Sequence, residues 1–143
     1  MSARGVTARR RAREVAFRVA YQADVAGDGY AEAWKTRRET EHLTADQLEL
    51  VEDIVRVLEA RGGEVDEALR GAAEHWPLAR MSATDRSVLR SAVAELIGRP
   101  GSPCRVVLDE AIEIARRYGS EDSGRFVNGV LDRVAHALRP AEL

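Results

Sequence analysis

The segment ARRRAREVAFRVAYQADVA, residues 8–26, says more about the architecture than any other part of the chain. Its apolar side chains recur every three or four residues, which is typical of an amphipathic helix packed against a core. At about 100° per residue, Arg10, Arg13, Phe17 and Tyr21 fall within about 80° of one another, opposite that apolar stripe. We therefore expect a helix with two faces, one of which turns guanidinium groups and a phenol ring outward.

The rest of the chain repeats the helical pattern between clear start and stop signals. Thr44 with Gln47 three residues later has the pattern of a capping box, Trp76-Pro77 closes a helical stretch, and the segment 99–103 carries two prolines and a glycine. Seven helices with short links predict an all-α bundle of two small helical subdomains within a single domain. The expected helices cover about residues 8–26, 30–39, 44–63, 65–75, 82–98, 104–118 and 120–139.

Length and composition fit one folded domain. The chain has 143 residues, of which 45% are hydrophobic and 32% charged, enough for a core without disulfides. Cys104 is the only cysteine. No apolar run approaches the roughly 18 residues that span a bilayer, and the basic N-terminus lacks the apolar stretch of a secretory signal. We expect a cytoplasmic protein with no membrane partner, with a flexible basic arm at 1–7 and a helical RNA-binding domain at 8–141.

The charge is distributed unevenly along the chain. Residues 1–20 contain six arginines and one acid, Glu14, so their side chains sum to +5 within a chain whose net charge is −2. A basic segment on an acidic body suits a polyanion such as nucleic acid, although a solvated tail has the same composition.

Several kinds of catalytic site lack their residues. The three histidines and Cys104 have no metal-ligand spacing, and no glycine-rich loop or Walker-type lysine could hold a nucleotide phosphate. Cys104 at a helix start could favour a thiolate, but a small structural residue is the simpler interpretation. The sequence therefore predicts a non-enzymatic protein with no metal and no cofactor.

The residue types at 9–21 do fit an RNA-binding surface. Arginine grips phosphate with paired donors, and exposed aromatic rings stack on unpaired bases at about 1–3 kcal/mol each. Since a duplex hides its bases, this combination favours single-stranded RNA or DNA. The alternative is that Phe17 and Tyr21 pack into a second layer of the bundle, and one of the two is expected to be core.

Four motifs in register resemble the NusB family of bacterial transcription antitermination factors. They are the arginine-rich A-R-R-R-A-R-E-V-A at 8–16 followed by Tyr21, D-R-S-V-L-R at 85–90, the form P-x-x-V-x-x-x-E-A-I-E at 103–113, and G-S-E-D-S-G-R-F-V-N-G-V-L-D at 119–132. Together they extend over nearly the whole chain, and only residues 27–75 match by helix pattern alone.

The resemblance implies a function and a set of contacts. It implies binding to the boxA element of ribosomal RNA transcripts together with NusE, a small-subunit ribosomal protein, within an antitermination complex on RNA polymerase. Asp85 would face NusE, while Asn128 and Gly129 would be structural, the first a polar group satisfied inside the fold and the second a close helix approach. The implied RNA-binding residues are Arg9, Arg10, Arg11, Arg13, Tyr21, Asp122, Ser123 and Phe126.

Two other functions remain open from the sequence. The chain could be a protein-only homodimeric interaction module whose arginines meet acidic patches, since some family members look dimeric with the arginine surface covered. It could also be a detached domain of a ribosomal RNA cytosine methyltransferase, in which a similar domain precedes the catalytic one. The sequence contains no S-adenosylmethionine-binding strand and glycine loop, which counts against the methyltransferase.

Overall fold

The computed structural model describes residues 3–142 as a helical bundle without strands, and it describes the side chains from residue 8 onward. The predicted all-α class is therefore confirmed. The helices are α1 (Ala3–Ala26), α2 (Tyr30–Arg38), α3 (Ala45–Ala72), α4 (Ala83–Gly98), α5 (Cys104–Tyr118) and α6 (Ser123–Leu138), with short 3₁₀ turns η1 (Leu78–Arg80) and η2 (Pro140–Glu142).

Local sequence signals set most of the helix ends. At the start of α3 the Gln47 amide N–H donates to the Thr44 hydroxyl and the Gln47 side chain accepts from the Thr44 N–H, which is the predicted capping box. At the start of α4 the Ser82 hydroxyl accepts from the Asp85 N–H. After α1, Gly27 adopts a φ of +76°, a conformation that favours glycine.

Two boundaries differ from the sequence expectation. The helices expected at 44–63 and 65–75 form one long helix, α3, with a kink where Arg61 leaves helical geometry (φ −129°, ψ 28°). Gly62 and Gly63 follow this kink without ending the helix. At the N-terminus α1 begins at Ala3, five residues before the expected start. Residues 1–2 of the predicted arm lie outside the described residues, and the flexibility of 1–7 stays a prediction.

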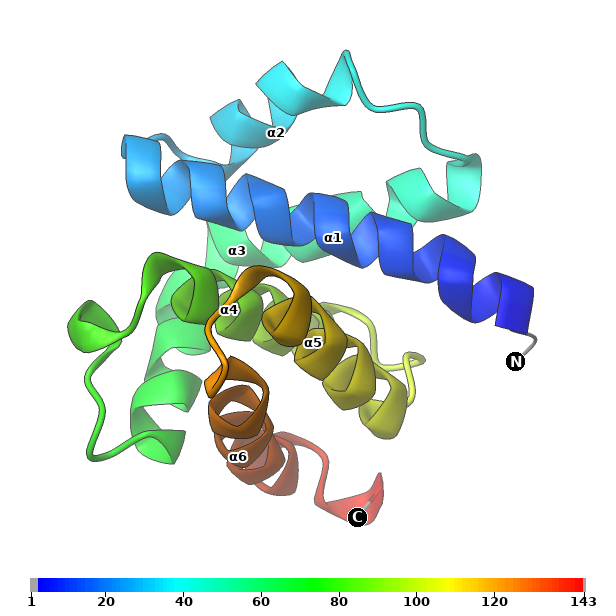
Figure 1. Cartoon of the computed structure of the whole chain (residues 1–143). Coiled ribbons are helices and arrows are strands. Elements are labelled where there is room, and N and C mark those ends of the chain that lie inside the picture. The colour runs from blue at the N-terminus through cyan, green and yellow to red at the C-terminus, as the bar shows by residue number, and fades with distance from the viewer. Residues whose placement is uncertain (1–2, 143) are drawn as a thin grey trace.

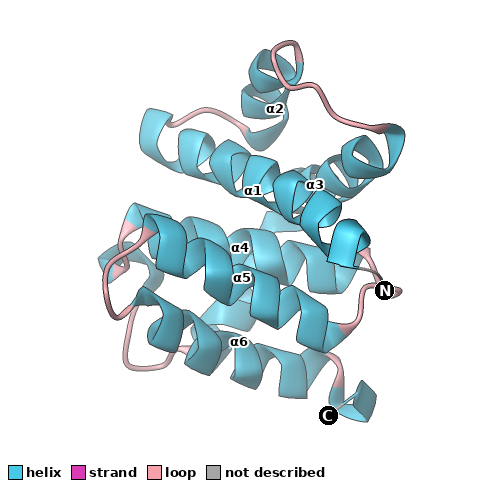
Figure 2. Cartoon of the chain, turned by 45° about the vertical axis from the view of Figure 1, so that its right-hand side comes forward, coloured by secondary structure: helices cyan, strands magenta, loops and turns pink. Residues whose placement is uncertain are grey.

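The six helices form two groups, with α1 between them. Figure 1 shows α2 above α1 and α4, α5 and α6 below it, and Figure 2 shows α1, α2 and the start of α3 as an upper group over the other three helices. The second half of α3 runs down beside α4 and α6 and so connects the groups. Because α1 packs on α3 on one side and on α4 and α5 on the other, both of its long faces are partly covered.

The core is continuous through both groups and consists mainly of leucine, valine, isoleucine and alanine. Leu50 and Ile54 of α3, Leu89 of α4, Leu108 of α5 and Leu131 of α6 are almost completely buried. None of the helices within residues 3–142 combines the length and apolar character needed to cross a membrane.

Two structural roles expected for α6 are wrong. Asn128 is exposed and not satisfied inside the fold, and a side chain at Gly129 would meet no atom within 4 Å, so Gly129 is not a point of close helix approach. Close approach occurs instead at Gly98, where a Cβ would lie 2.7 Å from Cγ2 of Val57. A Cβ at Gly124 would lie 3.0 Å from Cγ of Arg116, so this glycine lets the start of α6 pack against α5.

Candidate nucleic-acid interface

The guanidinium of Arg13 lies inside the protein and not on its surface. Arg13 is only 5% exposed and makes two hydrogen bonds to Glu95 of α4, from Nε at 2.8 Å and from Nη2 at 2.7 Å. The hydroxyl of Ser102 donates to the same carboxylate at 2.8 Å. The prediction that Arg13 faces outward is therefore wrong, because α4 and α5 cover this part of α1.

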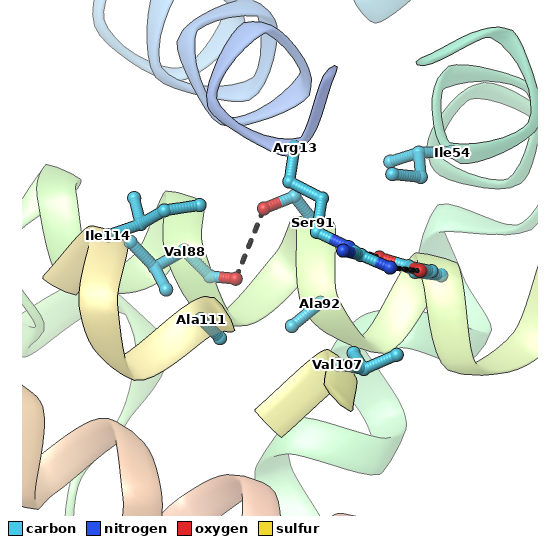
Figure 3. Close-up of a pocket in the computed structure, with 9 residues that line it drawn as sticks. Arg13, Ile54, Val88, Ser91, Ala92, Val107, Ala111 and Ile114 are labelled. Carbon is cyan, nitrogen blue, oxygen red and sulfur yellow. Dashed lines mark hydrogen bonds and ion pairs between the residues drawn. The ribbon is translucent and has the colours of Figure 1, made fainter. Parts of the chain in front are cut away.

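Arg13 also lines a small internal cavity. Figure 3 shows its side chain reaching from α1 into a space lined by Ile54, Ala92 and Val107. The cavity has a volume of about 10 Å³, room for about one water, and Nη1 of Arg13 is buried without a hydrogen-bond partner. Burial lowers the pKa of Arg13, but the hydrogen bonds and charge of Glu95 outweigh it, so the pKa lies above its ordinary value.

Arg10 is partly available to a ligand. Its Nε and Nη2 donate to the buried carboxylate of Glu110 on α5 at 2.7 and 3.1 Å, while 36% of the side chain remains exposed. The hydrogen bond from Glu110 raises the pKa of Arg10 above its ordinary value. Since Glu110 would otherwise be a buried, unpaired charge, Arg10 has a structural role as well as an exposed edge.

Arg9 and Arg11 are the accessible arginines of the motif. Arg9 contacts Asp46 at 3.3 Å and Arg11 contacts Glu41 at 3.2 Å, both in exposed ion pairs. Exposed pairs of this kind contribute about 0–1 kcal/mol, so a phosphate can replace the acidic partner at little cost.

The aromatic residues of α1 separate into one core ring and one surface ring. Phe17 is buried against Tyr118 of α5, with ring centroids 5.2 Å apart. Tyr21 is 40% exposed and lines a surface hollow of about 290 Å³ together with Arg18, Arg37 and Tyr118. The expectation that one ring is core and the Tyr21 phenol points outward is confirmed.

At the start of α6 the three predicted residues have different environments. Asp122 is exposed at the N-cap position, and its carboxylate makes no capping hydrogen bond. Phe126 is half-buried. Ser123 is buried, and its hydroxyl accepts from the Ser120 N–H at 2.9 Å, so the expectation of a surface position for Ser123 is wrong.

The structure brings the candidate RNA-binding and partner-binding residues into one hollow. Asp85 of α4 lines a hollow of about 300 Å³ together with Asp122, Phe126 and Trp76. One oxygen of Asp85, Oδ1, is buried without a hydrogen-bond partner. The adjacent residue, Thr84, lines the hollow that contains Tyr21. The first turn of α4 therefore lies between the two parts of the predicted surface.

A charge network holds this turn in position. The guanidinium of Arg86 donates to Asp24 at the end of α1 at 3.0 and 2.7 Å, and also to the carbonyls of Leu78 and Met81. Arg90 bridges Asp24 and Asp66. Hydrogen bonds from Arg86 lower the pKa of Asp24 below its ordinary value and outweigh burial, which raises it.

The network predicts a pH-dependent contribution to stability. Asp24→Asn should lower the free energy of unfolding by about 1–2 kcal/mol at pH 7, since the amide oxygen keeps one hydrogen bond but the charge is lost. Because the pKa of Asp24 is lower in the folded protein, its contribution is present above the unfolded value of about 3.9 and is lost as the pH falls through the folded value. Urea unfolding should therefore separate the two proteins at pH 7 and bring them together near pH 3. The exposed Asp109, changed to Asn, should have little effect at either pH.

Other chemistry has little support in the structure. No group of three or more His, Cys, Asp or Glu within the described residues could hold a metal ion. Cys104 is buried, and burial raises the pKa of its thiol, which disfavours the thiolate.

Sequence reasoning missed three residues of this surface: Tyr118, Trp76 and Arg125. Tyr118 closes the Tyr21 hollow from α5, and Trp76 shares the Asp122 hollow. Trp76 was interpreted only as the end of a helix before Pro77. Its size and its position beside a proline were the available signal, because an aromatic ring in a loop between helices often lies at the surface.

Comparison with known proteins gives consistent matches over the chain. The profile of the NusB family matches residues 10–136. The transcription antitermination protein NusB of Anaeromyxobacter dehalogenans strain 2CP-1 is 46% identical over 141 residues, covering 95% of this chain and 96% of that protein.

Two solved structures also match. The structure of T. maritima NusB superposes with a TM-score of 0.81 at 36% identity, covering 89% of each chain. A structure of the antitermination factors NusB and NusE in complex with double-stranded RNA has a TM-score of 0.81 at 29% identity, covering 92% of this chain and 98% of that one.

Proposed function

The chain belongs to the NusB family of transcription antitermination proteins, and from this membership we propose that it binds boxA-type single-stranded RNA of ribosomal RNA transcripts together with the ribosomal protein NusE. The RNA surface comprises Arg9, Arg10 and Arg11 at one end of α1, Tyr21 at the other, and Asp122 and Phe126 on α6. Asp85 contacts NusE. The pair then joins an antitermination complex on RNA polymerase.

The observation that carries this proposal is the exposure of the Tyr21 ring on the same helix as Arg9 and Arg11. Tyr21 lies eleven residues after Arg10, about 16 Å along the helix, so one strand of several nucleotides can reach both. Arg13 and Ser123 are left out because they are buried and hydrogen-bonded. A solved relative contains NusB, NusE and double-stranded RNA, so the test must compare single-stranded with double-stranded RNA.

The salt dependence of binding tests the arginine contacts. With three phosphates contacted, the logarithm of the association constant should fall with the logarithm of salt concentration with a slope of about −2 for a single strand. The double variant Arg9→Ala/Arg11→Ala should reduce the slope to about −0.7. Arg10 is unsuitable for this test, because its removal leaves Glu110 buried and unpaired.

A matched control is Arg56→Ala, which removes an exposed, ion-paired arginine on α3. Its slope should equal that of the unmodified protein. An unchanged slope in the Arg9/Arg11 variant would remove the start of α1 from the interface.

The alternative of a homodimeric, protein-only module makes a different prediction. Light scattering with and without boxA RNA separates the two: a dimer that RNA neither binds nor dissociates favours the interaction module. Relatives that match almost end to end carry the name antitermination protein, which favours antitermination over a detached methyltransferase domain.

A further inference from the structure

Trp76 is an exposed aromatic ring to which no role has yet been assigned. It lies in the segment between α3 and η1 and is 54% exposed. Its backbone N–H donates to the carbonyl of Ala73 at 3.1 Å, and its ring meets that of Phe126 edge-on, with centroids 6.2 Å apart at 61°. The indole is thus held at a defined place with much of its surface in water.

Two hollows of opposite character meet at this pair of rings. Trp76 and Phe126 line the acidic hollow with Asp85 and Asp122, and they also line a larger groove of about 560 Å³ between α6 and residues 71–76. Arg125 and Arg133 of α6 line this second groove, together with His75 and a single acid, Glu74. An anion is therefore favoured on the groove side of Trp76 and disfavoured on the other.

Arg125 differs from almost every other arginine of the chain. Of those whose side chains the structure describes, only Arg125 and Arg80 make no ion pair or hydrogen bond with another described residue. Arg80 lies in η1, four residues after Trp76. A free guanidinium next to two exposed rings is the combination that binds unpaired nucleotides, since the ring takes the base and the cation takes the phosphate.

We propose that Trp76, Phe126 and Arg125 form a platform for one unpaired nucleotide of the bound RNA, with its base on the Trp76 ring and its phosphate on Arg125. The proposal rests on the proposed function and extends the RNA path from Asp122 and Phe126 into the groove beside residues 71–76. Arg133 supports the groove by donating from Nη1 to the carbonyl of Ala72 at 2.9 Å.

Tryptophan fluorescence tests the platform directly, because the chain has two tryptophans and the other, Trp34, is buried. In a Trp34→Phe protein, titration with single-stranded boxA RNA should quench the Trp76 emission as the base stacks on the indole. Trp76→Ala should weaken RNA affinity about fivefold to tenfold and Arg125→Ala about threefold, while Trp76→Phe should retain most of the affinity. Arg105→Ala, an exposed arginine on α5, is the matched control and should leave the affinity unchanged.

The outcomes separate this inference from the proposed function. If RNA binds, Tyr21→Ala weakens it and Trp76→Ala does not, then the platform is wrong and the function stands. If Trp76→Ala weakens binding of NusE but not of RNA, the rings belong to the protein interface and the platform is also wrong. If the unmodified protein, alone and with NusE, binds no RNA, the proposed function fails first, and the platform fails with it.

Discussion

Arg13→Ala should lower the free energy of unfolding by about 3–5 kcal/mol, because it leaves Glu95 as an unpaired charge inside the core. For a chain of this size the melting temperature should fall by about 10–20 °C. The loss includes the two hydrogen bonds from Arg13 and leaves the Ser102 hydroxyl as the only remaining donor to Glu95. Chemical denaturation followed by circular dichroism measures the effect.

The double variant Arg13→Met/Glu95→Met is the control for this prediction. Replacing both members of a buried ion pair with apolar side chains of similar volume is often neutral, so most of the lost stability should return. RNA affinity of the folded double variant should match that of the unmodified protein. A single Arg13→Ala variant that keeps its stability but loses RNA affinity would return Arg13 to the binding surface.

Tyr21→Ala should weaken the affinity for single-stranded boxA RNA about tenfold to 100-fold, which corresponds to about 1.4–2.7 kcal/mol. The ring is 40% exposed on α1, in a hollow that also contains Arg18 and Tyr118. Removing it takes away a stacking surface without opening the core, since Phe17 fills the space beneath. Fluorescence anisotropy with labelled RNA gives the affinity.

The control for Tyr21 is the conservative variant Tyr21→Phe, which keeps the ring face and should bind within about threefold of the unmodified protein. Helix content and unfolding free energy should be nearly unchanged in both variants. Unfolding of Tyr21→Ala would mean that the ring belongs to the core, and unchanged affinity would remove it from the RNA path.

Local signals predicted the helices well because each signal acts within a few residues. The capping box at Thr44, the hydroxyl of Ser82 and the turn at Gly27 each fix a helix end by contacts at short range. The one merger, at Arg61, arose because two consecutive glycines weaken a helix without ending it when tertiary packing supports both halves.

The errors in the site come from contacts that span the chain. The helical pattern showed that Arg13 lies on a second face of α1, but Glu95 is 82 residues away and nothing near Arg13 announces that pairing. Asn128 faces solvent although a polar residue among core positions suggested burial. Residues that depend on one neighbour in sequence were predictable, and residues that depend on which distant helix covers them were not.

The position of α1 between the two helical groups affects how the protein is made. Its arginines pair with Glu95 and Glu110, and its Glu14 with Arg117, at separations of 82, 100 and 103 residues. During translation the N-terminal helix leaves the ribosome first, yet its charged partners are synthesised only after two-thirds or more of the chain has been made. Long-range contacts of this kind slow folding. A nascent chain that stops before α5 would carry an amphipathic, arginine-rich helix without its partners, so native RNA binding should arise only after synthesis is nearly complete.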